Sequence, residues 1–301
     1  MKGAAHVVVL DPGALTTIQD LGRPGHAHLG VPRSGALDVP ALRLANRLVG
    51  NPEGAPALET TLTGIRFEVR RGCRFAVSGA PCSVRIDGRD HAWGSAVSVG
   101  PGAVVQVGAA AAGLRSYVAF AGGIAVEQVL GSSSTDLLSG LGPAPLAAGD
   151  ELTLGPSYAE PPMATAIPTS LGRVLHLDPG PRADWFTEES LARVGGETYE
   201  VGAASNRIGL RLSGPALERR RDNGLPAELP TEPMVLGAVQ VPPNGQPVVF
   251  LADHPTTGGY PVIGVVRGAD LPVCAQARPG DRITLRWAEP ARAEPGRPRG
   301  S

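Results

Sequence analysis

The chain has 301 residues, a net charge of −1 and 42% hydrophobic residues. This length predicts two domains with sizeable cores, and the near-zero charge excludes the strong field that attracts nucleic acid or an anionic membrane. The 41 glycines and 30 prolines exceed ordinary usage and indicate a turn-rich protein, mainly β with a few short helices. The three cysteines form no CxxC pair and no apolar run suits a membrane helix, so we expect a soluble, cytoplasmic protein.

The first half of the sequence is typical of a β-rich domain. Residues 7–10 predict a strand, and two polar, glycine-rich loops follow over residues 16–25 and 30–38. Residues 62–108 alternate as a β meander. Two polar loops so close together suggest a region that binds something, and a long ordered surface loop is the alternative.

Residues 40–49 (PALRLANRLV) give the clearest helix pattern in the chain. Asp38 is placed to serve as its N-cap. Asn46 in this helix is expected to be exposed, the alternative being that its side chain reaches back toward the preceding loop. Glu59 either points into the same region or occupies a solvated strand position.

A hydroxyl-rich turn, LGSSSTD, spans residues 130–136. Such a turn can hold an anion through its hydroxyls and backbone N–H groups. It can equally cap the next short segment, and we favour capping.

Domain boundaries follow from the proline-rich stretch YAEPPMATAIPTS. Residues 158–170 are expected to be a linker, because three prolines and small residues do not sustain an element. The first domain is then residues 1–157 and the second residues 171–289, and residues 290–301 are expected to form a flexible tail.

The organising stretch of the second half is residues 237–260, GAVQVPPNGQPVVFLADHPTTGGY. Two strand patterns flank a Pro-Pro-Asn-Gly turn, which predicts a hairpin. Its second strand ends in Asp253, His254, Thr256 and Thr257, followed by two glycines and Tyr260. These groups suit a polar rim that binds a small anionic ligand, and the alternative is a loop whose Asp and Thr side chains cap their own backbone.

Several common site motifs are absent from the sequence. It contains no GxxxxGK[ST] phosphate loop, no GxGxxG after a strand, no GxSxG elbow and no HExxH. His26 and His28 lie two residues apart without a further ligand at metal spacing, so no metal site is predicted.

A family resemblance adds to this interpretation. The strings GALTTIQDLGRPG, GVPRSGALD, ANRLVGNP, YVAFAGGI, LGSSSTD, SNRIGLRL and GAVQVPPNGQPVVFLADHPTTGGYPVIGVV resemble the biotin-dependent carboxyltransferase-like family. That family includes the C subunits of 5-oxoprolinases, the KipA-type proteins and domains of the allophanate hydrolase subunit 2 type. The match runs in order from about residue 7 to residue 287, nearly the whole chain.

The resemblance implies two β-rich domains, with a cyclophilin-like barrel, and one component of an ATP-dependent 5-oxoprolinase that opens 5-oxo-L-proline to L-glutamate. It implies a KipI-like protein and a LamB/YcsF-like protein as partner subunits, with ATP and Mg²⁺ shared between them. The first alternative is the carboxyltransferase component of a urea carboxylase-like system, with biotin carried on a partner. The second is a non-catalytic KipA-type regulator that binds a KipI-like kinase inhibitor.

The resemblance also supplies candidate site residues. From residue chemistry we assign the acid/base role to Asp20 or Asp253 and anion binding to Arg23 and Arg207. The full set of substrate- or anion-binding candidates is Gln19, Arg23, Ser34, Asp38, Asn46, Ser132, Thr135, Arg207, Thr256, Thr257 and Tyr260.

Three departures from the family pattern bear on this set. Ser133 stands where Arg is commoner, Asn206 stands where Asp is commoner, and His254-Pro255 replaces a more usual Arg-Gln. A missing guanidinium removes a bidentate carboxylate or phosphate ligand, so Arg207 is the candidate to compensate near Ser133.

Overall fold

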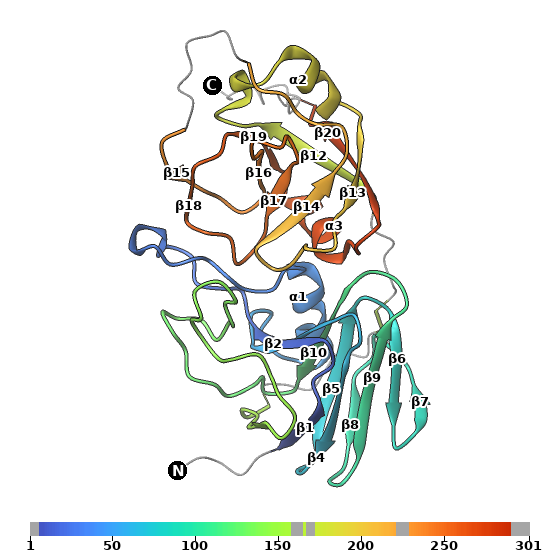
Figure 1. The fold of residues 1–301 in the computed structure, drawn as a ribbon. Helices are drawn as coiled ribbons and strands as arrows, with labels where there is room; N and C mark the ends of the chain where they lie inside the picture. Colours follow the sequence, from blue (N-terminus) through green and yellow to red (C-terminus); the bar gives the residue numbers. More distant parts are fainter. Residues whose placement is uncertain (1–5, 158–164, 167–171, 221–228, 290–301) are drawn as a thin grey trace, which may run out of the picture.

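The protein folds into two β-rich halves, joined where helix α1 of the N-terminal half meets the barrel half (Figure 1). The computed structural model describes residues 6–157, 165–166, 172–220 and 229–289. The expectation of a mainly β protein with a few short helices is confirmed.

The N-terminal half is built from two antiparallel sheets. The six-stranded sheet has the order β11 (Glu151–Leu152), β1 (Val7–Asp11), β4 (Ile65–Val69), β9 (Val104–Ala110), β6 (Cys82–Ile86) and β7 (Arg89–His91). The five-stranded sheet has the order β2 (Leu15–Gln19), β3 (Ala57–Thr61), β10 (Arg115–Phe120), β5 (Cys73–Gly79) and β8 (Val97–Val99). The predicted first strand and β meander are therefore present.

Strand β10 is buried along its whole length because both of its faces are covered. Phe120 points into the core between the sheets, where its ring lies 5.4 Å from that of Phe67 in an edge-to-face contact. Tyr117 and Ala119 belong instead to the cluster under helix α1 (Val39–Leu48). Successive side chains of a strand point to opposite faces of the sheet, so β10 contributes alternate residues to two apolar clusters.

Helix α1 begins where the sequence predicts. The Asp38 side chain accepts a hydrogen bond from the Ala41 N–H at 3.0 Å, which is the expected N-cap. The expectation that Asn46 is exposed is wrong, since its side chain is fully buried. Its amide donates to the carbonyls of Ala55 (2.8 Å) and Glu53 (3.2 Å), because the chain after the helix folds back and leaves those carbonyls without strand partners.

The barrel half is a closed sheet of seven strands. Their order is β12 (Val174–Pro179), β19 (Val262–Val266), β16 (Ala238–Gln240), β17 (Val248–Phe250), β14 (Gly209–Ser213), β13 (Thr198–Val201) and β20 (Arg282–Trp287). The predicted hairpin is confirmed, since β16 and β17 pair antiparallel with Val239 opposite Val249. Closure removes the exposed sheet edges that would otherwise invite association.

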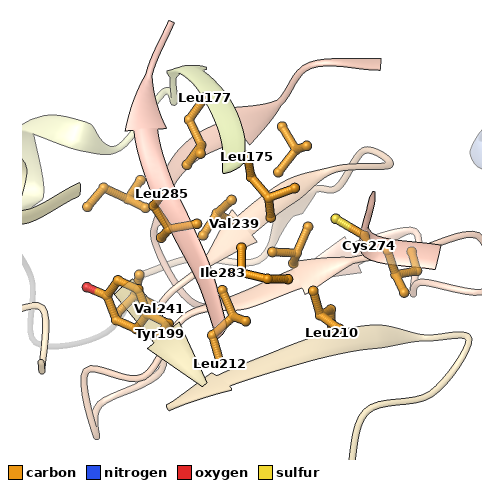
Figure 2. Close-up of a cluster of buried hydrophobic side chains, with 14 of the residues drawn as sticks. Leu175, Leu177, Tyr199, Leu210, Leu212, Val239, Val241, Cys274, Ile283 and Leu285 are labelled. Atoms are coloured by element: carbon orange, nitrogen blue, oxygen red, sulfur yellow. The ribbon is translucent and has the colours of Figure 1, made fainter. Parts of the chain in front are cut away.

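Alternate residues of these strands fill the barrel (Figure 2). Leu175, Leu177, Ile283 and Leu285 are fully or almost fully buried there, and Cys274 reaches in from helix α3 (Leu271–Gln276). A buried Leu or Ile contributes roughly 1.5–3 kcal/mol relative to an exposed one, so this core accounts for much of the stability of the half.

The remaining elements lie around the barrel or in the loops before α1. They are η1 (Ala27–Leu29), η2 (Ala183–Trp185), α2 (Glu188–Val194), η3 (Gly268–Asp270) and the two-stranded pair β15 (Glu232–Pro233) with β18 (Thr257–Gly258). Within the described ranges, no helix has the length and apolar character needed to cross a membrane.

The apolar cores of the two halves are separate. Among the described residues, the two clusters of the N-terminal half contain none beyond Ala166, and the barrel cluster draws only Leu37 from before residue 175. Most of the predicted linker, residues 158–164 and 167–170, and the predicted tail, residues 290–301, lie outside the described residues. Thr165 forms a β-bridge with Ser95, so this part of the stretch belongs with the N-terminal half.

Candidate functional site

A continuous layer of buried polar side chains joins the two halves. We call it the interdomain polar layer. It consists of Gln19, Ser34, Asp38, Glu59, Arg115, Tyr117, Thr135, Arg207, Asp253 and Gln276, all buried. Six of the predicted site residues belong to it, namely Gln19, Ser34, Asp38, Thr135, Arg207 and Asp253.

Arg207 lies at the centre of the layer and is 1% exposed. Its Nε and Nη2 donate to the two carboxylate oxygens of Asp253, each at 2.9 Å. Its Nη1 donates to Glu59 Oε1 at 2.5 Å, and Nη2 also donates to the Gly35 carbonyl at 2.7 Å. Burial alone would lower the pKa of Arg207, but the two carboxylates raise it above its ordinary value. In this conformation every guanidinium nitrogen is engaged, so its predicted anion-binding role would require an ion pair to open.

Glu59 points into the layer, which decides between the two alternatives for this residue. Its Oε2 accepts hydrogen bonds from the Tyr117 hydroxyl at 2.7 Å and the Leu37 N–H at 3.0 Å. Burial raises the pKa of Glu59, but Arg207 and Arg115 outweigh this effect and hold the pKa below its ordinary value. Two carboxylates, of Glu59 and Asp253, therefore face two guanidiniums, and the centre of the layer is electrically balanced.

The other end of the layer reaches helix α3. Gln276 donates from Nε2 to Asp38 Oδ2 at 2.8 Å, and its Oε1 accepts the backbone N–H of Arg115 at 2.9 Å. Burial raises the pKa of Asp38, although the hydrogen bonds from Gln276 and Ala41 act in the opposite direction. Arg115 donates from Nη1 to the Ala275 carbonyl. Arg115 of the N-terminal half and Gln276 of the barrel half thus each donate a hydrogen bond to the other half.

Asp253, one of the two predicted catalytic carboxylates, is completely buried. Besides its bidentate pair with Arg207, it accepts the Leu137 N–H at 3.1 Å and lies 3.0 Å from the Ser34 hydroxyl. Ser34 adopts a left-handed backbone conformation (φ 52°), which a non-glycine residue holds only where its surroundings enforce it. The acid/base role of Asp253 stays a prediction, and in this conformation its acceptor positions are occupied by the protein.

Asp20, the second predicted carboxylate, lies beside the layer. It accepts hydrogen bonds from the hydroxyls of Ser132 (2.7 Å) and Ser134 (2.5 Å) and from the backbone N–H groups of Ser133 (2.6 Å) and Gly22 (2.7 Å). The serine-rich turn thus does hold an anion, and that anion is the Asp20 carboxylate. Ser132 also accepts the Ser134 N–H at 3.0 Å, so the local capping expected of this turn is present as well.

Glycines allow the two polar loops of the N-terminal half to pack backbone against backbone. The Arg23 N–H donates to the Arg33 carbonyl at 2.7 Å, and the Ala36 N–H donates to the Asp20 carbonyl at 2.9 Å. Gly35 has a φ of 95°, and a Cβ there would lie 2.8 Å from the Gly22 nitrogen. A side chain at this position would therefore separate the loops that carry Asp20 and Ser34.

Four buried polar atoms near this junction have no hydrogen-bond partner within the described residues: Gln19 Oε1, Arg23 Nη1, Thr135 Oγ1 and Asp136 Oδ2. Their residues are linked, since Gln19 Nε2 donates to the Thr135 carbonyl at 3.0 Å and Arg23 donates to the Ser134 and Val129 carbonyls. Buried polar groups are normally satisfied, so a bound water or a ligand group is expected there.

The remaining candidates lie apart from the layer. Thr257 and Tyr260 are exposed on the barrel half, Tyr260 by 44%, and Thr256 is partly exposed beside them. Asn46 binds the loop after α1 and contacts no member of the layer among the described residues. The structure thus unites the candidates from the two polar loops with Arg207 and Asp253, and separates them from Asn46 and from the strand-end threonines.

Sequence reasoning missed three members of the layer: Arg115, Tyr117 and Gln276. Arg115 and Tyr117 belong to RSYVAF, which also contains Ser116, so their sequence gives no clear signal. Gln276 stands in the otherwise apolar run LPVCAQA, and a lone polar residue in such a run is the signal that could have identified it. Across the described ranges, no group of three His, Cys, Asp or Glu residues is placed to hold a metal ion.

Comparisons with known proteins agree on one family. The family model described as "Carboxyltransferase domain, subdomain A and B" matches residues 29–287. The C subunit of the Escherichia coli 5-oxoprolinase is 39% identical over 279 residues, which cover 91% of this chain and 89% of that protein.

Solved structures share the fold. A crystal structure of TTHA0988 matches with a TM-score of 0.83 and 36% identity, over 93% of this chain and 55% of that chain. The K. lactis urea amidolyase matches with a TM-score of 0.84 and 32% identity, over 93% of this chain and 18% of that chain. This chain therefore spans about half the length of TTHA0988 and less than a fifth of the urea amidolyase.

Proposed function

Because this chain belongs to the carboxyltransferase domain family, subdomains A and B, we propose that it is the C subunit of a 5-oxoprolinase, which opens 5-oxo-L-proline to L-glutamate with hydrolysis of ATP. The observation that carries the proposal is the end-to-end match with the Escherichia coli C subunit, which covers 91% of this chain and 89% of that protein. The urea amidolyase has most of its length outside the matched region.

The proposed substrate is a lactam, and its C–N bond is stabilised by resonance like a peptide bond. Opening the ring requires a group that polarises the carbonyl and a group that moves protons. Asp20 and Asp253 are our candidates for proton transfer. Because both accept internal hydrogen bonds, either would act only after one of those bonds is released.

The role of Asp253 is tested with the variant Asp253→Asn in the assembled complex. A catalytic carboxylate predicts a loss of roughly 10²–10⁴-fold in kcat in protein that still folds. A purely structural carboxylate predicts a lower unfolding temperature and an unchanged kcat in the fraction that remains folded.

ATP would be shared with a partner protein. Phosphate binding requires guanidinium or backbone donors that are not already engaged. Of the two arginines predicted to bind anions, Arg207 has no nitrogen left, whereas Arg23 keeps one buried nitrogen without a partner among the described residues. We therefore place Arg23 nearest the anionic part of the reaction, and propose that KipI-like and LamB/YcsF-like partner subunits supply the remaining contacts to ATP and Mg²⁺.

A second candidate function is carboxyl transfer from biotin carried on a partner. The family model and the TM-score of 0.84 with the K. lactis urea amidolyase favour it. A non-catalytic regulator that binds a KipI-like protein is the third.

The deciding experiment purifies the chain with candidate KipI-like and LamB/YcsF-like subunits and measures glutamate formed from 5-oxoproline, with and without ATP. Glutamate that requires both this chain and ATP supports the proposal. An assembled complex that forms no glutamate but transfers carboxyl groups supports the second function, and one that does neither supports the third.

A further inference from the structure

Large apolar side chains are exposed almost entirely in one region of the molecule. Among the described residues seven such side chains are exposed, and six of them belong to loops near the junction of the two halves. Single exposed leucines are normal on a protein surface, whereas a group of them marks an interaction site. We call the six residues, which are 37–60% exposed, the apolar loop face: Leu29, Leu130, Leu137, Leu138, Val235 and Tyr260.

Two loops of the N-terminal half carry the four leucines of this face, and both are bonded to the end of strand β17. The loop that contains Leu29 continues to Ser34, whose N–H donates to the Ala252 carbonyl at 2.9 Å. The loop with the other three leucines is held by the Leu137 N–H, which donates to the Asp253 carboxylate at 3.1 Å. Both loops therefore start from the same place on the barrel half.

The barrel half supplies the remaining two members beside the same strand end. The N–H of Met234, which precedes Val235, donates to the Thr256 carbonyl at 2.9 Å. Strand β15 pairs with β18, which ends two residues before Tyr260. Figure 1 shows these loops together at the left of the view, away from β6, β7 and β9 at the right. The apolar loop face thus spans both halves of the protein.

The longest of these loops presents no charge to solvent. Residues 121–150, all of which the structure describes, join β10 to β11 and form no helix or strand beyond single bridges. Of the 22 residues 128–149 only Asp136 is charged, and its side chain is buried, although 18% of the whole chain is charged. Long ordered loops are usually functional, and depletion of charge is typical of the centre of a protein interface.

Internal hydrogen bonds hold this loop in a fixed shape. Asp136 Oδ1 accepts the N–H groups of Leu138 at 2.8 Å and Ser139 at 2.9 Å, and the Asp136 carbonyl accepts the Gly140 N–H at 3.0 Å. The resulting tight turn carries Leu137 and Leu138, which are 37% and 46% exposed. A surface that is already ordered loses little conformational entropy on binding, so the turn is preorganised to receive a partner.

We propose that the apolar loop face is the surface on which the KipI-like partner subunit docks, in contact with both halves at once. Because the proposed function supplies this partner, the docking surface rests on that function. In TTHA0988 the region that matches this chain is 55% of the whole, so a further 45% is joined covalently to the same fold. Where such a component is a separate protein, it must be held by a surface, and the apolar loop face offers one.

The properties of this face define the surface expected on the partner. Its centre should be apolar and without charge, because a charge buried against the uncharged loop would lose its hydration and gain no counter-ion. The contact also has a place in the proposed reaction. The Leu137 N–H bonds the Asp253 carboxylate directly, so a docked partner lies one hydrogen bond from that candidate catalytic group.

The test measures the Kd of the full chain for the KipI-like subunit by calorimetry, with Leu130→Asn as the face variant and Leu62→Asn as its control. Leu62 is the seventh exposed residue and lies outside the face, at the end of β3. The two leucines match in exposure (42% and 41%) and in left-handed backbone conformation (φ 52° and 61°). Asparagine tolerates this conformation better than leucine does, so both variants should keep the wild-type unfolding midpoint.

We expect Leu130→Asn to raise Kd by roughly tenfold or more, and its combination with Leu138→Ser by roughly 100-fold, because each leucine buries apolar area in the complex. Leu62→Asn should leave Kd within about twofold of wild type. Hydrogen exchange of the full chain gives a second measurement. Binding of the KipI-like subunit should slow exchange over residues 128–142 and leave β6 and β7 unchanged.

Wild-type affinity in the double variant, or unchanged exchange over residues 128–142, would overturn the docking surface, and glutamate formed by that complex would leave the proposed function intact. Weakened binding in the face variants, in a wild-type complex that forms no glutamate, supports the docking surface while the proposed function fails. A wild-type chain that does not bind the KipI-like subunit overturns the docking surface. Light scattering that shows a dimer of this chain, made monomeric by Leu130→Asn, also overturns it, since a second copy then occupies the face.

Discussion

Replacing Glu59 by glutamine tests whether charge balance in the interdomain polar layer stabilises the protein. The substitution keeps the shape of the side chain and removes one of the two carboxylates that face Arg207 and Arg115. Both guanidiniums are almost fully buried and would share the single charge of Asp253.

The expected magnitude is large. Removing one partner of a buried ion pair costs about 3–5 kcal/mol, mostly because the remaining charge stays buried without compensation. Adding Arg115→Met to Glu59→Gln restores the balance, since Arg207 then faces Asp253 alone. We therefore expect the double variant to be more stable than the sum of the single effects predicts, by about 0.5–3 kcal/mol.

The assay is urea unfolding of the full chain at pH 7, followed by fluorescence of Trp93 in the N-terminal half and of Trp185 and Trp287 in the barrel half. Because the pKa of Glu59 is below its ordinary value in the folded state, its contribution is complete above the unfolded-state pKa and disappears as pH falls through the folded-state pKa. Glu59→Gln should lack that acid-induced loss. A single variant within about 0.5 kcal/mol of wild type, or strictly additive effects in the double variant, would refute the charge-balance argument.

Three further results are expected. Asn46→Ala should lower the free energy of unfolding by about 1–3 kcal/mol, because two loop carbonyls lose their donor. Arg43→Ala, at an exposed position of the same helix, should change the free energy of unfolding by less than about 0.5 kcal/mol. Equal effects of the two variants in urea titrations would contradict this. Gly35→Ala should destabilise by about 1–3 kcal/mol, because its φ of 95° disfavours a side chain and a Cβ would meet the Gly22 backbone; an unchanged unfolding midpoint would show that the loops can separate freely. Burial lowers the pKa of His254 in the folded state, so the unfolded chain binds a proton on this imidazole at higher pH than the folded chain does. As pH falls below about 6.5, the free energy of unfolding of wild type should therefore decrease faster than that of His254→Asn. Parallel curves of unfolding free energy against pH would exclude the effect.

Local patterns predicted the elements well because the signals that define them are local. Helix α1 with its Asp38 cap and the hairpin of β16 and β17 each depend on spacings of a few residues. The position of Asn46 could not be predicted in this way. Its surroundings are created by chain returning after the helix, so a polar residue on a helix was assigned to solvent although it is buried.

The candidate site shows the same limit more strongly. Asp20 and the serine-rich turn were both identified as polar features, but their contact spans 112 residues of sequence and joins two patterns that each looked complete alone. The sequence indicates that charged and polar side chains gather at this site, but it does not indicate which groups those side chains contact. A buried carboxylate needs donors, and the sequence does not say whether those donors come from a ligand or from the chain itself.

The long sequence separation between Glu59 and Arg207 has a consequence for synthesis of the chain. Arg207 follows Glu59 by 148 residues, which corresponds to a delay of roughly 7–30 s at about 5–20 residues per second. During that interval the N-terminal half emerges from the ribosome without its partner half. The face of the N-terminal half that later contacts the barrel half carries Glu59, Arg115 and Asp38. This face is exposed to water, and hydrophilic, until the barrel half has been synthesised and has folded against it. A polar junction therefore protects the nascent half from aggregation, which an apolar junction of the same area would promote.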